Sequence, residues 1–493
     1  MARSRPAWAV LVVCCVAQFM VVLDVTIVNV ALPGIKTSLG MTTADQQWVI
    51  NAYTLTFAGF LMLGARAADL FGRRRVFLVG LGLFTLCSLA GGLADAPTWL
   101  IAARAGQGLG GAILAPATLS TLTATFTEED QRRRVLGAWS ATAASGAAAG
   151  LVAGGVLTDL LDWRWVLFVN VPIGAVLAFA AFPSLAPERP TATGKKLDTM
   201  GAVTVTAALT LLVYGIVTTD QHSWSSPVTV TFLGAGIVAF AGFLVVEARF
   251  AKQPLVPLGI FANRSVVVAN TVAATIGASL FGMYFFVSLY LQQINGYSPL
   301  RAGFAFVPAG LATMTGALVG TRVVKRVGPR RQLLIGLPTA ALGMAWLTQA
   351  VAGSAYLTHV LIPLLLTGVG LGLSFVPSTM SGTAGLPPSQ AGLASGLITT
   401  TRQVGAAIGL AAMTTVATTH MTDETDLHPS SVITSTGIDR AFAVNAAILV
   451  AGALFSLLLR PNATAKPVAS RRNQDEQSSI AHSSCRMGDH SRR

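Results

Sequence analysis

Long apolar stretches separated by short polar segments run along almost the whole chain. A helix that crosses a membrane needs roughly 20 mainly apolar residues at a rise of about 1.5 Å per residue. By this criterion the sequence predicts about fourteen membrane-spanning helices, near residues 8–30, 46–66, 76–94, 98–122, 135–157, 164–183, 199–218, 228–247, 266–291, 302–323, 332–350, 357–380, 391–417 and 438–459. The first stretch is too long for the apolar core of a signal peptide, so we expect an uncleaved span.

Basic residues are distributed unevenly between alternate loops. If the N-terminus is cytoplasmic, most of the 33 Lys and Arg residues fall in cytoplasmic loops or at inner helix ends. Four basic residues lie outside, namely Lys36, Arg164, Arg301 and Arg440. Two more, Arg104 and Arg402, lie within spans. This asymmetry follows the positive-inside rule and requires an even number of spans. We expect a multi-pass protein of the cell membrane with both termini in the cytoplasm.

The composition excludes an ordinary soluble fold. Hydrophobic residues make up 53% of the 493 residues and charged residues only 11%, against about a quarter in soluble domains. Membrane lipid must therefore be the solvent for most of the chain. The net charge of +13 is explained by cytoplasmic loops, so we expect no nucleic-acid partner. The four cysteines have no spacing typical of a disulfide framework or a metal site.

An internal repeat divides the chain into related halves. Glycine and arginine positions in Gly64–Arg75 recur in register 256 residues later, in Gly320–Arg331. A second set, Gly137, Gly146 and Gly150, recurs 259 residues later as Gly396, Gly405 and Gly409. Duplicated six-helix halves around a central site are typical of secondary transporters. The repeat predicts an N-terminal half over 1–190, two inserted helices within 191–262, a C-terminal half over 263–460 and a disordered cytoplasmic tail over 461–493.

Two charged residues within spans are candidates for ion coupling, because charge inside a membrane is costly and usually functional. Asp24 lies roughly 24 Å from the inner end of its span, so about 6 Å below the outer edge of the apolar layer. Arg104 lies roughly 9 Å below the same edge. The matching depths predict an ion pair, which either carries a proton at Asp24 or is purely structural.

Further polar residues interrupt the apolar spans. Arg402 lies near the middle of its span and could contact substrate, balance Asp24 or donate to helix carbonyls. Candidate polar points of a substrate cavity are Gln18, Asn29, Asn51, Asn170, Asn270, Arg402 and Gln403. Apolar walls with such points suit a small amphipathic or aromatic substrate.

The sequence Gly106–Gly111 has the form G-x-G-x-x-G, yet it lies inside a predicted helix without the strand that a dinucleotide site requires. Close helix packing explains these glycines better. No motif of an ATP-hydrolysing domain is present, so we expect an ion gradient as the source of energy. We also expect no cofactor and no metal.

Several stretches together resemble the major facilitator superfamily, specifically its branch of fourteen-span drug:proton antiporters. Residues 23–33 match the motif of the first span in that branch, and 69–75 resemble the motif of the loop between spans 2 and 3. Residues 104–108 resemble the fourth-span motif, and 163–174 the sixth-span signature. The resemblance implies an all-α major facilitator fold with two six-helix halves plus two inserted helices.

The resemblance also implies roles for individual residues. Asp24 would be the proton-coupling acid, with Arg104 as its partner in proton transfer. An inner gate between the halves would consist of Asp69, Gly72, Arg73 and Arg75. An antiporter motif that accompanies export would consist of Gly146, Gly150, Gly154 and Gly155. The implied function is a monomeric antiporter, not an enzyme, that exchanges protons for drugs, antibiotics or secondary metabolites and confers resistance.

The chain departs from the family pattern at three positions. Ala65 and Ala67 stand where the loop motif has glycine and leucine, and Leu151 stands where the antiporter motif has proline. Because that motif accompanies export, the departure at Leu151 keeps open a symporter that takes up a nutrient. A membrane sensor or scaffold without transport is a third hypothesis, against which the charges within the spans count.

Overall fold

The computed structural model describes residues 7–185, 198–220, 222, 224–250, 254–386, 388–423 and 430–459, and this part of the chain is helical with no strand. The predicted tail over 461–493 lies outside the described residues. The helices are α1 (Ala7–Leu39), α2 (Thr43–Phe71), α3 (Arg73–Gly92), α4 (Pro97–Thr125), α5 (Glu129–Leu160), α6 (Trp165–Phe168), α7 (Asn170–Ser184), α8 (Thr199–Val217), α9 (Pro227–Val245), α10 (Arg264–Leu289), α11 (Pro299–Val327), α12 (Pro329–Leu347), α13 (Ile362–Thr383), α14 (Pro388–Asp423) and α15 (Ser430–Ser456). Short 3₁₀ or π turns are η1 (Thr218–Asp220), η2 (Val246–Phe250), η3 (Leu258–Ala262), η4 (Tyr290–Ile294) and η5 (Leu357–Leu361).

Every predicted span contains a helix, but not every helix is apolar enough to be identified as a span by composition. Ten of the described helices are long and apolar enough to cross a membrane. The helices outside that set are α4, α5, α12 and α14. They are rich in glycine and alanine and carry polar residues such as Gln107 and Gln332. Their lower hydropathy is consistent with helices that face protein over much of their surface.

The sixth predicted span, 164–183, is one helical stretch in the structure, Trp165–Ser184. Its two parts, α6 and α7, are joined at Val169, which keeps helical φ and ψ angles. Asn170 is the first residue of α7 and is fully buried. This helix therefore places a polar side chain inside the bundle.

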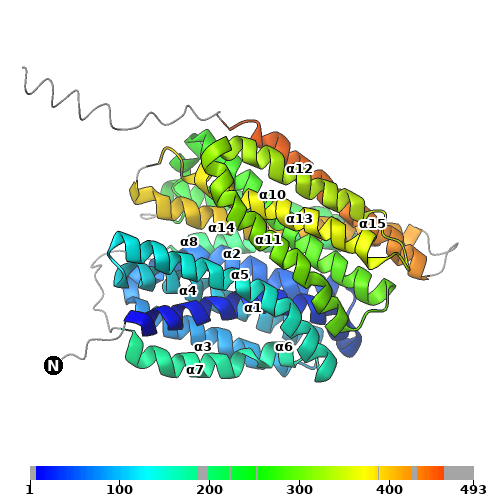
Figure 1. Cartoon of the computed structure of the whole chain (residues 1–493), viewed down its shortest axis with the longest axis horizontal. Helices are drawn as coiled ribbons and strands as arrows, with labels where there is room; N and C mark the ends of the chain where they lie inside the picture. The colour runs from blue at the N-terminus through cyan, green and yellow to red at the C-terminus, as the bar shows by residue number, and fades with distance from the viewer. Residues whose placement is uncertain are drawn as a thin grey trace, which may run out of the picture. The chain divides into compact units, whose positions relative to one another are not determined.

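Two groups of helices, α1–α7 and α10–α15, repeat the same packing. In the first group α1 packs on α5, and α4 packs on both α2 and α3. In the second group α10 packs on α14, and α13 packs on both α11 and α12. Figure 1 shows the two groups on either side of a boundary, with blue to cyan helices on one side and green to orange helices on the other. The order of these pairs along the chain agrees with the order of the sequence repeat.

Glycines of the repeat occupy equivalent contacts in the two groups. A methyl group at Gly146 would lie 2.9 Å from the carbonyl oxygen of Phe19, and one at Gly150 would lie 2.7 Å from that of Leu23. In the second group Gly405 and Gly409 meet the α10 backbone in the same way. Both helix pairs can approach closely only because these positions lack a side chain.

The turns that follow α2 and α11 have the same backbone conformation. Gly72 has φ 88° and Gly328 has φ 81°, a region that residues with a side chain rarely adopt. Each glycine ends one helix and immediately precedes the next. The repeated loop motif is therefore a repeated structural turn.

The two groups meet through α5 against α11 and α2 against α14. Hydrogen bonds join them at the C-terminal end of α1: Ser288 Oγ donates to the carbonyl of Asn29 at 2.9 Å, and Gln292 Nε2 donates to that of Val30 at 3.0 Å. A methyl group at Gly303 would lie 2.6 Å from the carbonyl oxygen of Leu151. Leu151, where the family motif has proline, thus lies in the contact between the groups.

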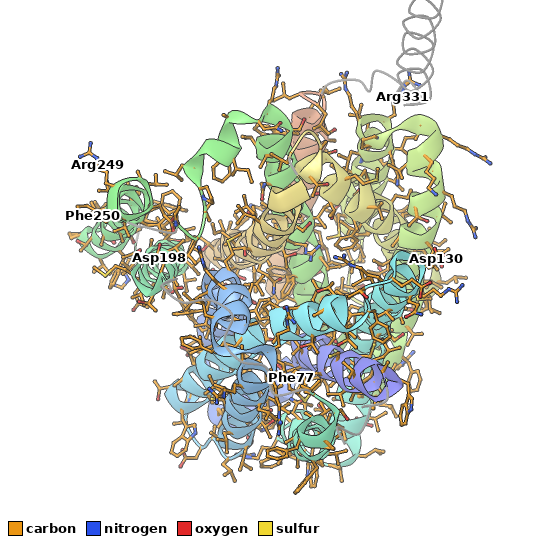
Figure 2. All side chains as sticks on the ribbon, turned by 90° about the vertical axis from the view of Figure 1, so that its left-hand side faces the viewer. Phe77, Asp130, Asp198, Arg249, Phe250 and Arg331 are labelled. Atoms are coloured by element: carbon orange, nitrogen blue, oxygen red, sulfur yellow. The ribbon has the colours of Figure 1, made fainter. Side chains whose placement is uncertain are left out.

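Helices α8 and α9 pack on each other beside the boundary. The contacts of α8 with the rest of the bundle are to α2 and α14, one helix from each group. Figure 2 shows Arg249 and Phe250 at the far edge of this pair, and Asp198 at the start of α8. Helices α8 and α9 therefore lie at the side of the bundle and do not enter the interior of either group.

The α1–α5 contact gives a prediction about stability. We expect Gly150→Ala to lower the free energy of unfolding by about 1–3 kcal/mol, because the added methyl overpacks the interface. Gly137→Ala on the same helix is the matched control, since a methyl there meets nothing within 4 Å. Thermal unfolding of the purified proteins in detergent measures the difference. Equal unfolding temperatures for the two variants would contradict the packing role of Gly150.

Candidate functional site

The site is centred on Asp24, a fully buried carboxylate within α1. Its Oδ2 accepts a hydrogen bond from Arg104 Nη1 at 2.6 Å. Its Oδ1 accepts from Gln107 Nε2 at 2.7 Å and from Asn170 Nδ2 at 2.8 Å. Helices α1, α4 and α7 therefore meet at one carboxyl group, and the ion pair that the matching depths predict is present.

Arg104 is held almost as tightly as the acid that it faces. It is 2% exposed, and its Nε donates to the carbonyl of Val49 on α2 at 3.1 Å. Its Nη1 also donates to Gln107 Oε1 at 2.7 Å. The guanidinium carbon lies 4.5 Å from the centre of the Tyr53 ring, within the range of a cation–π interaction. Arg104 is thus oriented by α2 as well as by Asp24.

A shell of neutral polar groups surrounds the ion pair. Ser88 on α3 accepts hydrogen bonds from Gln107 Nε2 and Asn170 Nδ2, both at 3.0 Å, and donates to the carbonyl of Leu167 at 2.9 Å. The Tyr53 hydroxyl and Asn170 Oδ1 are buried and have no hydrogen-bond partner among the described residues. Buried polar groups usually have partners, so these two atoms leave hydrogen-bonding capacity beside Asp24.

The hydrogen bonds of this cluster compensate the burial of both charged groups. A buried charge is tolerated when it is paired and hydrogen-bonded, and Asp24 has one cationic donor and two amide donors. The contact between α1 and α4 at this point therefore consists of an ion pair and its amide donors.

The candidate gate residues lie at the junction of α2 and α3. Gly72 forms the turn, and Arg73 Nε donates to Ser120 Oγ on α4 at 2.8 Å. Arg75 is exposed and borders an apolar groove of about 270 Å³ between α2, α3 and α4. The side chain of Asp69 lies outside the described residues. This hydrogen bond joins two helices of the first group, and the gating role of these residues stays a prediction.

The four glycines of the antiporter motif serve two different contacts. Gly146, Gly150 and Gly154 face α1, where a methyl group at Gly154 would lie 3.3 Å from Ile27 Cα. Gly155 faces α11 instead, and a methyl group there would lie 2.6 Å from the carbonyl oxygen of Pro299. The motif thus packs α5 against the first helix and against the second group at once.

The candidate cavity residues do not lie together in one place. Asn170 belongs to the Asp24 cluster and is fully buried, and its role toward substrate stays a prediction. Asn29 Nδ2 donates to the carbonyl of Val25 within its own helix at 2.9 Å. Gln18 Oε1 and both polar atoms of Asn51 are buried without a partner among the described residues.

The remaining three candidates lie in the second group. Asn270 on α10 accepts from Thr401 Oγ1 on α14 at 2.9 Å. Arg402 and Gln403 follow directly on α14 and are both half-buried. The site therefore separates into an acid cluster in α1–α7 and a polar band in α10 and α14.

Three residues of the acid cluster were not among the predicted site residues. Gln107 follows Arg104 by three positions, which places it on the same helix face, so the spacing could have identified it. Tyr53 and Ser88 carry no such signal, because single hydroxyls in apolar helices are common and their partners come from other helices. Within the described residues, no group of three His, Cys, Asp or Glu side chains could hold a metal ion.

The buried ion pair gives a second prediction about stability. We expect Arg104→Gln to destabilise the protein by about 3–5 kcal/mol, because it leaves Asp24 as an uncompensated buried charge. The double variant Asp24→Asn/Arg104→Gln removes both charges and is expected to recover much of that loss. Thermal unfolding in detergent compares the two. If the double variant is no more stable than Arg104→Gln, the charge on Asp24 is not the cause of the lost stability.

Comparisons with known proteins place this geometry in a family. The family model of the Major Facilitator Superfamily matches residues 14–410. A cephamycin export protein from Amycolatopsis lactamdurans is 45% identical over 84% of this chain and 86% of its own length. A puromycin resistance protein from Streptomyces alboniger is 42% identical, over 83% of this chain and 82% of its own. A tetracenomycin C resistance and export protein from Streptomyces glaucescens is 33% identical, over 83% and 76%.

Solved structures share the fold at low identity. A bacterial homologue of the human lysosomal transporter Spinster, in an inward-facing and unoccupied conformation, has a TM-score of 0.65 at 16% identity over 92% of this chain and 96% of its own. A peptide transporter in complex with sulfate also has a TM-score of 0.65, at 15% identity over 91% and 95%. This multi-pass membrane chain therefore belongs to the major facilitator superfamily and is a transporter, not an enzyme.

Proposed function

We propose that the chain is a proton-coupled antiporter that exports drugs, antibiotics or secondary metabolites. The observation that carries the proposal is the Asp24 cluster, in which one fully buried carboxylate is bound by Arg104, Gln107 and Asn170. Such a group inside a membrane bundle is a typical proton site. The relatives support the proposed class of substrate, because their names describe export of antibiotics or resistance to them.

The proposed cycle uses two states of Asp24. With the carboxyl ionised, the ion pair with Arg104 holds α1 against α4. When a proton from outside binds, Arg104 loses its countercharge, and the pair no longer favours that arrangement. A change between outward and inward access then moves the proton to the cytoplasm while substrate moves outward.

The proton gradient supplies enough energy for such export. One proton moving down one pH unit yields about 1.4 kcal/mol, and a potential of 100 mV adds about 2.3 kcal/mol per charge. Together these sustain a concentration gradient of a neutral substrate of roughly a few hundred-fold. One proton bound at Asp24 per cycle is therefore sufficient to drive export against such a concentration gradient.

The proposed topology has fourteen spans, two six-helix halves (α1–α7 and α10–α15), two inserted helices and a cytoplasmic N-terminus. The recurring helix packing and the two positive-φ glycine turns support the division into halves. With this orientation, the hydrogen bonds at Asn29 and Val30 close the outer end of the bundle. The conformation is then one that loads substrate from the cytoplasm, as an exporter requires.

Flux through proteoliposomes tests the proposal. We expect an imposed pH gradient to drive uphill transport of at least one of three probes, a cephamycin, puromycin or tetracenomycin C, in the direction opposite to the protons. Asp24→Asn should abolish uphill transport, because an amide carries no exchangeable carboxyl proton. It should retain exchange of substrate at equal pH, which shows that the variant is folded.

Asp24→Glu is the matched control and should keep part of the uphill transport, because it retains an acid. Undiminished uphill transport by Asp24→Asn would refute the role of this residue. Movement of substrate in the same direction as protons would show a symporter instead. No gradient-dependent flux of any probe by the natural sequence would refute the proposed function.

A further inference from the structure

We propose that Arg402 binds the carboxylate of the transported substrate, so that the chain prefers organic anions. This inference rests on the proposed export function and specifies the class of substrate for it. Its basis is a guanidinium near the middle of a membrane-spanning helix that has no acid beside it. A cation in such a position requires either a permanent countercharge or one that arrives with a ligand.

Among the residues that the structure describes, no permanent countercharge lies beside Arg402. No acidic residue within the described part of the chain forms an ion pair with it, and it forms no hydrogen bond there. Asp24, which could have balanced it, already accepts from Arg104, Gln107 and Asn170. Of the three roles that the sequence leaves open for Arg402, contact with substrate is the one that remains.

The neighbouring helices do not supply an acid at the same level either. Helix α14 packs on α2, α8, η1, α10, α13 and α15, and α8, α10 and α13 contain no Asp or Glu. Gly396 of α14 faces Met62 of α2, and this pairing puts Asp45 and Asp69 about 16 and 20 Å along the axis from Arg402.

The acids of η1 and α15 are also far from Arg402. Asp220 ends η1, where the adjacent Thr219 donates to Thr415 of α14, a position roughly 20 Å along the axis from Arg402. Asp439 lies on α15 near Tyr290, which is roughly 20 Å along α10 from Gly277, the residue that packs on Arg402.

The surroundings of Arg402 suit an organic anion. Gly277 of α10 packs closely on Arg402, and a methyl group there would meet the carbonyl oxygen of Arg402 and lie 3.0 Å from its Cγ. The guanidinium carbon lies 5.3 Å from the centre of the Phe375 ring on α13. A guanidinium offers paired N–H donors that match a carboxylate, and the ring beside it offers an apolar face to the body of the same molecule.

Other polar residues lie on the same turn of α14 and face other sides of the helix. Thr400 Oγ1 is buried without a partner among the described residues, and Gln403 is half-buried. Thr401 is bonded to Asn270 across the α10–α14 contact. Because the Asp24–Arg104 pair is neutral as a whole, Arg402 gives this part of the bundle a net positive charge. An anionic substrate would neutralise that charge when it binds.

The same proteoliposomes test the inference with a matched pair of probes, a cephamycin with its free carboxylate and the methyl ester of that molecule. The variants are Arg402→Gln, Arg402→Lys and, as a control, Arg249→Gln at an exposed position. We expect Arg402→Gln to raise the KM for the acid by about 10- to 100-fold, the effect of losing a hydrogen bond to a charged group. The KM for the ester should change less than about threefold.

Arg402→Lys should retain most of the preference for the acid, and Arg249→Gln should behave as the natural sequence. Equal changes for acid and ester in Arg402→Gln, or an unchanged KM for the acid, would overturn the inference. Transport of the ester but not of the acid by the natural sequence would also overturn it and leave proton-coupled export standing. Absence of coupled flux of both probes and of puromycin and tetracenomycin C would refute the proposed function, and with it this inference.

Discussion

The ion pair between Asp24 and Arg104 is the constraint on which the first group of helices depends. A charge in the interior of a membrane bundle is stable only with a partner and a full set of hydrogen bonds. The cluster therefore brings α1, α3, α4 and α7 to one point, where Gln107 and Asn170 donate to Asp24 and Ser88 accepts from both amides. The close approach of α5 to α1 permits this convergence.

The second group repeats the packing but not the chemistry. The glycine contacts of α5 on α1 recur as those of α14 on α10, so the scaffold is duplicated. The acid cluster has no equivalent among the described residues of α10–α15, where Arg402 is an unpaired cation instead. This division is consistent with one half that handles the proton and another that handles the substrate, coupled through α5, α11, α2 and α14 at the boundary.

Much of this organisation could be predicted from the sequence, because hydropathy, loop charge and the repeat are periodic and local. The depths of Asp24 and Arg104 predicted their contact, since a helix converts residue number directly into height. The height of a residue does not say which side of a helix faces a ligand, so the roles of the predicted cavity residues, Asn170 among them, stay predictions. Tyr53 and Ser88 were missed for a related reason: their partners are set by tertiary packing.

The proposed cycle requires that Asp24 exchanges a proton in step with substrate binding. This exchange can be measured as proton release from the purified protein in weakly buffered detergent solution when a transported probe is added over a series of pH values. We expect the natural sequence to release protons as the probe saturates and Asp24→Asn to bind the probe without release. Equal release by both proteins, or saturable binding by the natural sequence without any release, would contradict it.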